Sequence, residues 1–180
     1  MNGLSIYLQV KIIIMGDSKD LRNEDAANKI KKLADDIGTC MFCTYDASKL
    51  QSRPMSAQEI DEEGNLWFLS NKNSNKNKQI QQNSEVELFF ASGHDKFLSL
   101  HGNATINYDK NKIEDLWNPI IKVWMTGGVD DPNLSIIKVT PNDGYYWNNK
   151  NGKMVAFAKM TAALLTGITM DDGIEGNLSL

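Results

Sequence analysis

A run of cationic and aromatic residues between positions 53 and 78 contains the chemistry needed to bind a planar ligand with a phosphate group. Arg53 begins an extended segment, Leu66–Ser70 reads as an apolar strand, and the loop from Lys72 to Lys78 has three lysines and no acidic residue. A helix that starts in this loop, with Ser74 as its N-cap, would add backbone N–H groups and the positive end of its dipole. An ordinary hairpin followed by a solvated basic loop would have the same residue types, so the rest of the chain must decide between the two.

The composition describes an acidic protein of one domain. The chain has 180 residues, of which 41% are hydrophobic and 23% are charged, and its net charge is −4. This length fits one domain with at most a short appendage. Because binding to a nucleic-acid backbone requires a clustered excess of Lys and Arg, the negative charge argues against nucleic acid as a partner. The lysines of the central loop are therefore a local feature.

Two cysteines, Cys40 and Cys43, have the C-x-x-C spacing of a redox dithiol or of half a zinc site. A zinc site would need further ligands, and the chain has only His94 and His101 to offer. The surrounding segment 39–45 is rich in strand formers, and residues three apart on a strand point to opposite faces. We therefore expect no metal site and two buried, unpaired thiols, which fit the reducing cytoplasm.

The remaining polar residues do not form a recognisable catalytic set. Glycine-rich nucleotide-binding motifs and the G-x-S-x-G motif are absent from the sequence, and two histidines do not support a Ser/His/Asp triad. We interpret His101, beside Gly102, as a hydrogen-bonded strand residue and Asp130-Asp131-Pro132 as a turn. A chain without acid–base machinery but with a cationic and aromatic pocket fits a cofactor that carries the reactivity itself.

The hydrophobic pattern predicts a mainly β protein of the α+β class, with six to eight strands and short flanking helices. Helical spacing of apolar residues extends over 25–37 and stops at Gly38. Most connections are hairpins, so the sheet should be antiparallel and tend to close into a small barrel. The expected strands are 39–45, 53–60, 66–70, 85–92, 97–108, 134–140, 144–148 and 153–158. The other expected helices are 76–82, one after Asp109, one after Pro119 and 159–166.

Three parts are expected along the chain. Residues 1–24 read as an N-terminal extension, because the apolar run in 1–14 has no basic start or cleavage site and is too short to span a membrane. An extra strand or an anchor is the alternative for 1–14. Residues 25–167 would form the barrel domain and 168–180 a polar tail. No membrane segment is predicted, and we expect a cytoplasmic protein.

The order of these motifs resembles the pyridoxamine 5′-phosphate oxidase-like split-barrel flavoproteins, and within them the bacterial general stress protein subgroup. The resemblance extends from about residue 25 to the C-terminus. The matching motifs are Arg53-Pro54-Met55, Leu66–Ser70, Ser74-x-Lys76, Leu100-His101-Gly102, Leu116-Trp117-Asn118, Trp124, Gly127–Pro132 and Tyr146-Trp147.

The resemblance implies an antiparallel split β-barrel that forms a homodimer and binds FMN in two sites at the subunit interface. Arg53 and Lys76 would pair with the phosphate, the first as a fork of donors and the second as a point charge. Trp124 would contribute from the partner subunit, whereas Lys72 and Lys78 would be solvated. The residues that would line the flavin ring and its ribityl chain are Pro54, Met55, Ser56, Trp67, Phe68, Leu69 and Ser70.

Two departures from the family pattern limit the expected activity. Asn75 stands where the oxidases have an arginine, and the C-terminal segment lacks their substrate-binding Arg and His. Oxidation of pyridoxamine phosphate is therefore not expected. The sequence leaves open a stress-associated FMN-dependent oxidoreductase with a small redox substrate, and a non-catalytic module that binds or senses a flavin, a haem or a deazaflavin. A dimer with an empty pocket is a third interpretation.

Overall fold

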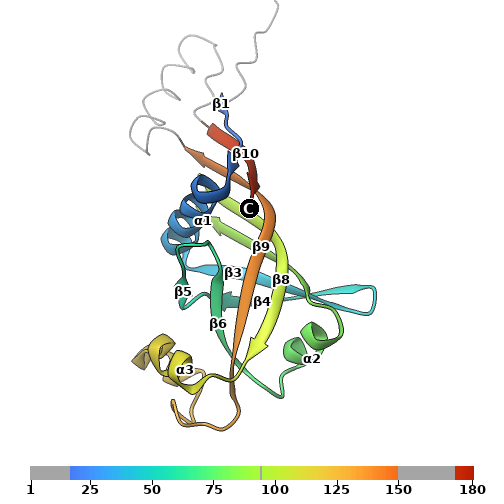
Figure 1. The fold of residues 1–180 in the computed structure, drawn as a ribbon, viewed down its shortest axis with the longest axis vertical. Helices are drawn as coiled ribbons and strands as arrows, with labels where there is room; N and C mark the ends of the chain where they lie inside the picture. Colours follow the sequence, from blue (N-terminus) through green and yellow to red (C-terminus); the bar gives the residue numbers. More distant parts are fainter. Residues whose placement is uncertain (1–16, 94, 150–172) are drawn as a thin grey trace, which may run out of the picture.

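One long strand, β9 (Leu134–Asn149), is the axis of the fold (Figure 1). The structure is a computed structural model and describes residues 17–93, 95–149 and 173–180. Strand β8 (Lys96–Asn107) pairs antiparallel with β9 along its whole length. On its other edge, β9 pairs with β6 (Leu66–Asn71) in its first part and with β10 (Gly173–Ser179) in its last part. The sheet is therefore split where β9 changes neighbours.

The described residues form ten strands in one mixed sheet that is not closed. Its main path has the order β1-β10-β9-β8-β7-β3-β4, with β5 on the far edge of β6, while β1 and β2 pair parallel with β10. The predicted fold class, mainly β with short helices, is confirmed. The sheet has more strands than the six to eight predicted, because three of the ten have only two residues each. The remaining strands are β1 (Asp17–Ser18), β2 (Leu21–Arg22), β3 (Thr39–Asp46), β4 (Lys49–Ser56), β5 (Glu59–Ile60) and β7 (Glu85–Ser92).

Helix α1 (Asn23–Ile37) covers one face of the sheet. Its buried Ile30 and Leu33 join a core that includes Phe42, Phe68 and further strand residues. The helix ends at Gly38, which has a φ of 81° and donates its backbone N–H to the Ala34 carbonyl oxygen. The predicted helix over 25–37 and its glycine stop are confirmed.

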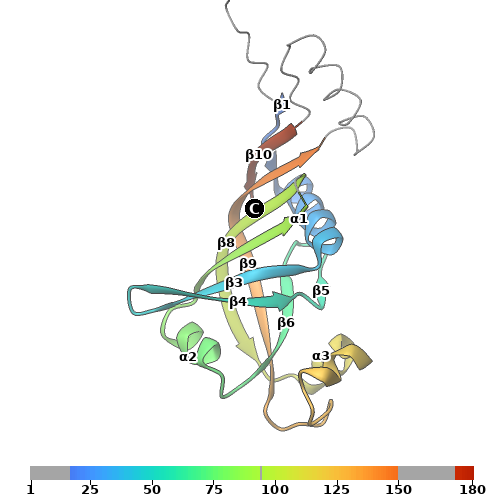
Figure 2. The ribbon, with the colours of Figure 1, turned by 180° about the vertical axis from the view of Figure 1, so that it is seen from behind.

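Two helical lobes lie at the end of the sheet away from α1 and on opposite sides of it (Figures 1 and 2). One lobe is α2 (Asn75–Gln82), which the loop after β6 leads into. The other contains α3 (Lys110–Leu116) and the 3₁₀ helix η1 (Pro119–Val123). This second lobe packs on its own apolar cluster, which consists of Leu69, Ile113, Leu116, Ile121, Leu134 and Ile136.

Two predicted strand limits are wrong. The strand predicted over 53–60 begins earlier, at Lys49, because the turn between β3 and β4 needs only residues 47 and 48, with Ala47 at a φ of 54°. The strand ends at Ser56, and β5 is a separate strand. The strands predicted over 134–140 and 144–148 are one strand, β9. Its register shifts opposite His101 and Gly102. A Cβ on Gly102 would lie 2.5 Å from the Thr140 carbonyl oxygen, so this crossing requires glycine.

The expected polar tail also differs from the structure, because residues 173–179 form β10. Its polar sequence gives no strand signal, but Leu178 is only 1% exposed and faces Gly144 of β9 and Leu21 of β2. Of the extension predicted over 1–24, residues 17–24 contain β1, β2 and the start of α1, and residues 1–16 lie outside the described residues. The predicted turn 149–152, strand 153–158 and helix 159–166 also lie outside them, except Asn149 at the end of β9. The domain limits therefore stay predictions. Among the described helices, none has the length and apolar character needed to cross a membrane.

We predict that Leu178→Ala lowers the free energy of unfolding by about 2–5 kcal/mol, because it leaves a cavity in the core beside β9. Denaturant unfolding followed by circular dichroism measures this change. Leu180→Ala is the matched control: Leu180 is 40% exposed, so its loss should change stability by no more than about 0.5 kcal/mol. Equal effects of the two substitutions would show that β10 does not belong to the folded core.

Candidate functional site

Arg53 lies on the inner face of β4, opposite Phe42 of β3. Its Nη1 donates to Thr44 Oγ1 at 2.6 Å and to the Phe42 carbonyl oxygen at 3.4 Å, and its Nη2 donates to Gln79 Oε1 at 3.2 Å. Thr44 Oγ1 in turn donates to Gln79 Oε1 at 2.6 Å. Every acceptor is neutral. The guanidinium is therefore held in place without being neutralised, and in the part of the chain that the structure describes it forms no ion pair.

Lys76 is a second cation close to Arg53. It lies in the first turn of α2 and is half-buried. Burial, together with the positive charge of Arg53, lowers the pKa of Lys76 to about 8. Burial also lowers the pKa of Arg53. Removing like charges from water without a counter-ion is costly. No carboxylate of the described residues pairs with Lys76, so the two side chains form a cation pair that an anion would stabilise.

A buried polar network fixes the start of α2 against the sheet. Ser74 is the N-cap, and its Oγ accepts from the Asn77 backbone N–H at 3.3 Å. The fully buried Asn77 side chain accepts from Ser70 Oγ of β6 at 2.7 Å and donates to Ser135 Oγ of β9 at 2.9 Å. The predicted N-cap is confirmed. The network positions Lys76, which precedes Asn77 on the helix.

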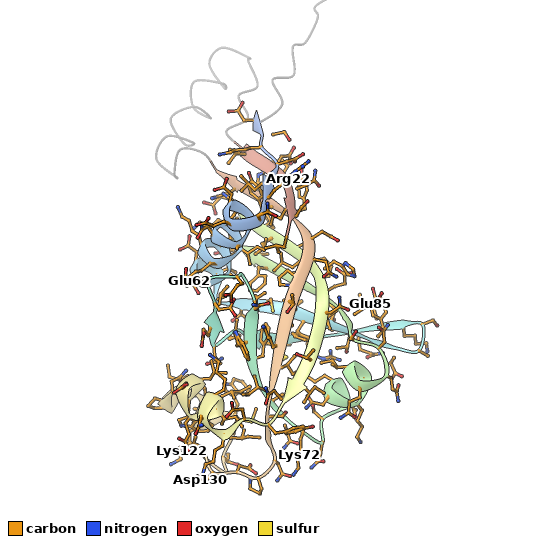
Figure 3. All side chains as sticks on the ribbon, in the orientation of Figure 1. Arg22, Glu62, Lys72, Glu85, Lys122 and Asp130 are labelled. Carbon is orange, nitrogen blue, oxygen red and sulfur yellow. The ribbon has the colours of Figure 1, made fainter. Side chains whose placement is uncertain are left out.

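The other two lysines of the loop have different surroundings. Lys78 is exposed, as predicted. Lys72 is not merely solvated: its Nζ donates to the Pro132 carbonyl oxygen at 2.8 Å, and its backbone N–H donates to the Asn133 carbonyl oxygen at 2.8 Å. Figure 3 shows Lys72 at the same end of the molecule as Asp130. Lys72 therefore ties the loop to the segment before β9.

The side chains of β6 are engaged with other parts of the protein. Phe68 is buried, with its ring 5.2 Å from that of Phe42 in an edge-on contact. Leu69 belongs to the apolar cluster under α3. Trp67 donates its Nε1–H to Asp61 Oδ2 at 3.0 Å, and Lys112 lies over its ring at 4.6 Å. Since the Ser70 hydroxyl is engaged with Asn77, any contact of these residues with a ligand near Arg53 would rest on backbone groups.

Strand β4 is an edge strand of the described sheet and pairs only with β3. Its outer edge therefore offers backbone groups beside Arg53. Pro54 is exposed, as is usual for proline at an edge, and Ser56 Oγ lies 2.9 Å from Thr39 Oγ1. Met55 is half-buried against the core. Trp124 is 81% exposed. Because it follows η1, it belongs to the lobe on the opposite side of the sheet from α2.

The other candidates from the sequence have structural surroundings. Cys40 and Cys43 are buried and unpaired, and burial raises the pKa of Cys40 to about 12. His101 Nδ1 lies 3.5 Å from Asp143 Oδ2. Asp131 Oδ1 accepts from the Asn133 backbone N–H at 2.8 Å, as in a turn. Over the described ranges, no group of three or more His, Cys, Asp and Glu side chains could hold a metal ion.

Sequence reasoning missed the residues that hold Arg53 and the start of α2. Thr44 shares a strand face with Phe42, so its burial could have been inferred from strand alternation. Gln79 and Asn77 give no such signal, because polar residues in a short polar helix normally face water. Their roles depend on where α2 lies against β3, β6 and β9, which the sequence does not specify.

The comparisons with known proteins place this arrangement in a family. The family model described as pyridoxamine 5′-phosphate oxidase like matches residues 25–171. General stress protein 26 of Bacillus subtilis (strain 168) is 23% identical over 127 residues, which cover 68% of this chain and 89% of that protein.

Solved structures show the same fold. A structure from Jannaschia sp. CCS1 has a TM-score of 0.72 at 21% identity and covers 87% of this chain and 98% of that one. The general stress FMN/FAD binding protein from Xanthomonas citri has a TM-score of 0.60 at 28% identity, over 71% of this chain and 91% of that one. Because the family model spans most of the chain, the protein belongs to the pyridoxamine 5′-phosphate oxidase-like family.

Proposed function

We propose that this protein binds FMN, with the flavin phosphate held between Arg53 and Lys76. The observation that carries the proposal is the cation pair itself: two half-buried positive groups lie close together, and the groups that fix Arg53 are neutral. A phosphate monoester at this place would supply the missing negative charge. Membership of the family and the FMN/FAD binding protein of Xanthomonas citri support a flavin as the rest of the ligand.

The residues present fit such a ligand. Arg53 offers a planar fork of donors already fixed by Thr44 and Gln79, and Lys76 offers a point charge. The first turn of α2 adds backbone N–H groups and the positive end of a helix dipole. The backbone of β4 from Pro54 to Ser56 is the proposed contact for the ring system. With Asn75 in place of a further cation, phosphate affinity rests on two side chains.

We favour an FMN-dependent oxidoreductase, related to pyridoxamine 5′-phosphate oxidase and associated with stress, that acts on a small redox substrate in the cytoplasm. When bound, the flavin would supply the hydride or electron transfer, and the chain would bind its phosphate and orient its ring. Non-catalytic flavin, haem or deazaflavin binding is the second candidate. It is favoured by the surroundings of Arg53, where Thr44, Gln79 and Phe42 provide no acid or base.

We also propose that the protein is a homodimer, because one sheet face exposes a continuous apolar patch. This patch, called the outer patch, comprises Met41, Phe89, Phe97, Tyr145 and Trp147, each 36–45% exposed. Cross-strand pairing places Met41 opposite Phe89 and Phe97 opposite Trp147, so these side chains share one face. Pro54 pairs with Met41 and extends the face to the strand that carries Arg53.

A second copy of this chain is the occupant that the outer patch fits. An apolar surface is complementary to itself across a two-fold axis, as an isologous interface requires. A copy docked there would also reach the β4 edge, where the flavin ring is proposed to lie. The exposed Trp124 would then be available to complete the partner's site.

We predict that Arg53→Ala and Lys76→Ala each weaken FMN binding by about 1.5–3 kcal/mol, or roughly 10- to 150-fold, because each removes a charged hydrogen bond to the phosphate. Quenching of flavin fluorescence on titration measures the dissociation constants. Lys78→Ala, an exposed change in the same helix, should leave the affinity within about twofold. Unchanged affinity in both site variants would show that the phosphate binds elsewhere, and a wild-type protein that takes up no FMN would refute the proposed function.

For the interface, we predict that Phe89→Glu converts a dimer to a monomer, because it places a charge in the centre of the outer patch. Sedimentation velocity on the purified protein gives the mass of each species. Tyr108→Glu is the control, since Tyr108 is 54% exposed but outside the outer patch, and it should remain dimeric. A wild-type monomer at tens of micromolar, or a Phe89→Glu dimer, would contradict the proposed interface.

A further inference from the structure

The amine of Lys76 has surroundings that neither of the other loop lysines shares. Lys72 is bonded to the Pro132 carbonyl oxygen, and Lys78 is exposed two residues further along the same helix. Lys72 is also half-buried, but Lys76 lies beside Arg53: Gln79, three residues further along the same helix, accepts from Arg53 Nη2 at 3.2 Å, and the two positive charges repel. Lys76 has no acidic partner in the described chain. A lysine amine in these surroundings is a potential nucleophile.

Two effects of this geometry favour attack on a phosphorylated electrophile. Arg53, held by Thr44 and Gln79, can bind the phosphate part of a small molecule and keep it beside the amine, which raises its local concentration. The lowered pKa of Lys76, about 8, leaves roughly a quarter of the amine neutral at pH 7.5, against about one part in a thousand for an ordinary lysine. A bound phosphate would raise this pKa part of the way again, so both effects are needed.

We propose that Lys76 is a modification site for small acyl phosphates when the phosphate site holds no other anion. The neutral Nζ attacks the acyl carbon, a C–N bond forms and the C–O bond to the phosphate breaks. The amine proton leaves with the phosphate group, which is released as hydrogen phosphate. The product is a neutral amide, and the step requires no oxidant or reductant. The acyl group thus removes one of the two charges of the cation pair.

A regulatory consequence rests on the proposed function. If Arg53 and Lys76 hold the FMN phosphate, then acylation of Lys76 and FMN binding exclude one another. Acyl phosphate would inactivate protein that has no flavin, and bound flavin would protect the amine. The site would in this way respond both to the supply of flavin and to the supply of activated acyl groups.

The test uses the full-length protein and acetyl phosphate at pH 7.5, with peptide mass spectrometry to follow acetylation of Lys72, Lys76 and Lys78 over time. We expect Lys76 to react at least about tenfold faster than Lys78, the matched control on the same helix. Inorganic phosphate or FMN should remove this preference. The rate at Lys76 should rise from pH 6.5 and level off above about pH 8, because only the neutral amine reacts. Arg53→Gln, with its folding checked by circular dichroism, should react with acetyl phosphate at Lys76 much more slowly than the wild-type protein does, while its rate at Lys78 stays unchanged.

A second reagent distinguishes acylation directed by the phosphate site from general reactivity of the Lys76 amine. The N-hydroxysuccinimide ester of acetate carries no phosphate, so its preference for Lys76 should be smaller than that of acetyl phosphate and should fall less in Arg53→Gln, which changes only the pKa of the amine for this reagent. Equal rates at Lys76 and Lys78 with acetyl phosphate, or a preference that survives inorganic phosphate, would overturn the inference. FMN binding without selective acetylation would overturn this inference alone, whereas selective acetylation without FMN binding would overturn the proposed function alone.

Discussion

The continuous pairing of β8 with β9 is the interaction on which the rest of the structure depends. Because β8 occupies one edge of β9 throughout, the other edge is left for two partners, β6 and then β10. β6 leads directly into the lysine loop, and its Ser70, with Ser135 of β9, holds Asn77 of α2. The start of α2, which carries Lys76, is therefore positioned by its contacts with β6 and with the central strand β9.

The electrostatics of the site follow from the choice of neutral acceptors for Arg53. Gln79 accepts from the guanidinium through its Oε1, while its Nε2 donates to Asp46 Oδ2 at 3.4 Å, so a neutral amide lies between the cation and this carboxylate. A carboxylate in direct contact with Arg53 would form a closed ion pair with little attraction left for a ligand. Fixing the cation with an amide and a hydroxyl keeps its charge available. Burial lowers the pKa of Lys76, and the unneutralised charge of Arg53 beside it acts in the same direction.

Local signals in the sequence predicted much of this architecture. The helix over 25–37 with its glycine stop, the Ser74 cap, the helix after Asp109, and most strands follow from periodicity and capping chemistry. Errors occurred where tertiary contacts decide. Leu178 is one of few large apolar residues in a polar segment, and its strand exists because β9 has a vacant edge. The break predicted between 134–140 and 144–148 is a register shift within β9, at the close crossing opposite His101 and Gly102. Arg53 and Lys76 were predicted as the phosphate ligands from the sequence. The neutral acceptors that fix Arg53, Thr44 and Gln79, come from elements that only the fold brings together.

The central claim is that an unneutralised cation pair makes the phosphate the main determinant of ligand binding. The most direct measurement compares the affinities of FMN and riboflavin, which differ only in the phosphate, for the same flavin-free protein at one pH and ionic strength. Two charged hydrogen bonds to the phosphate predict that FMN binds at least about 100-fold more tightly. Equal affinities for the two flavins would contradict the account, because the phosphate would then make no contact with Arg53 or Lys76.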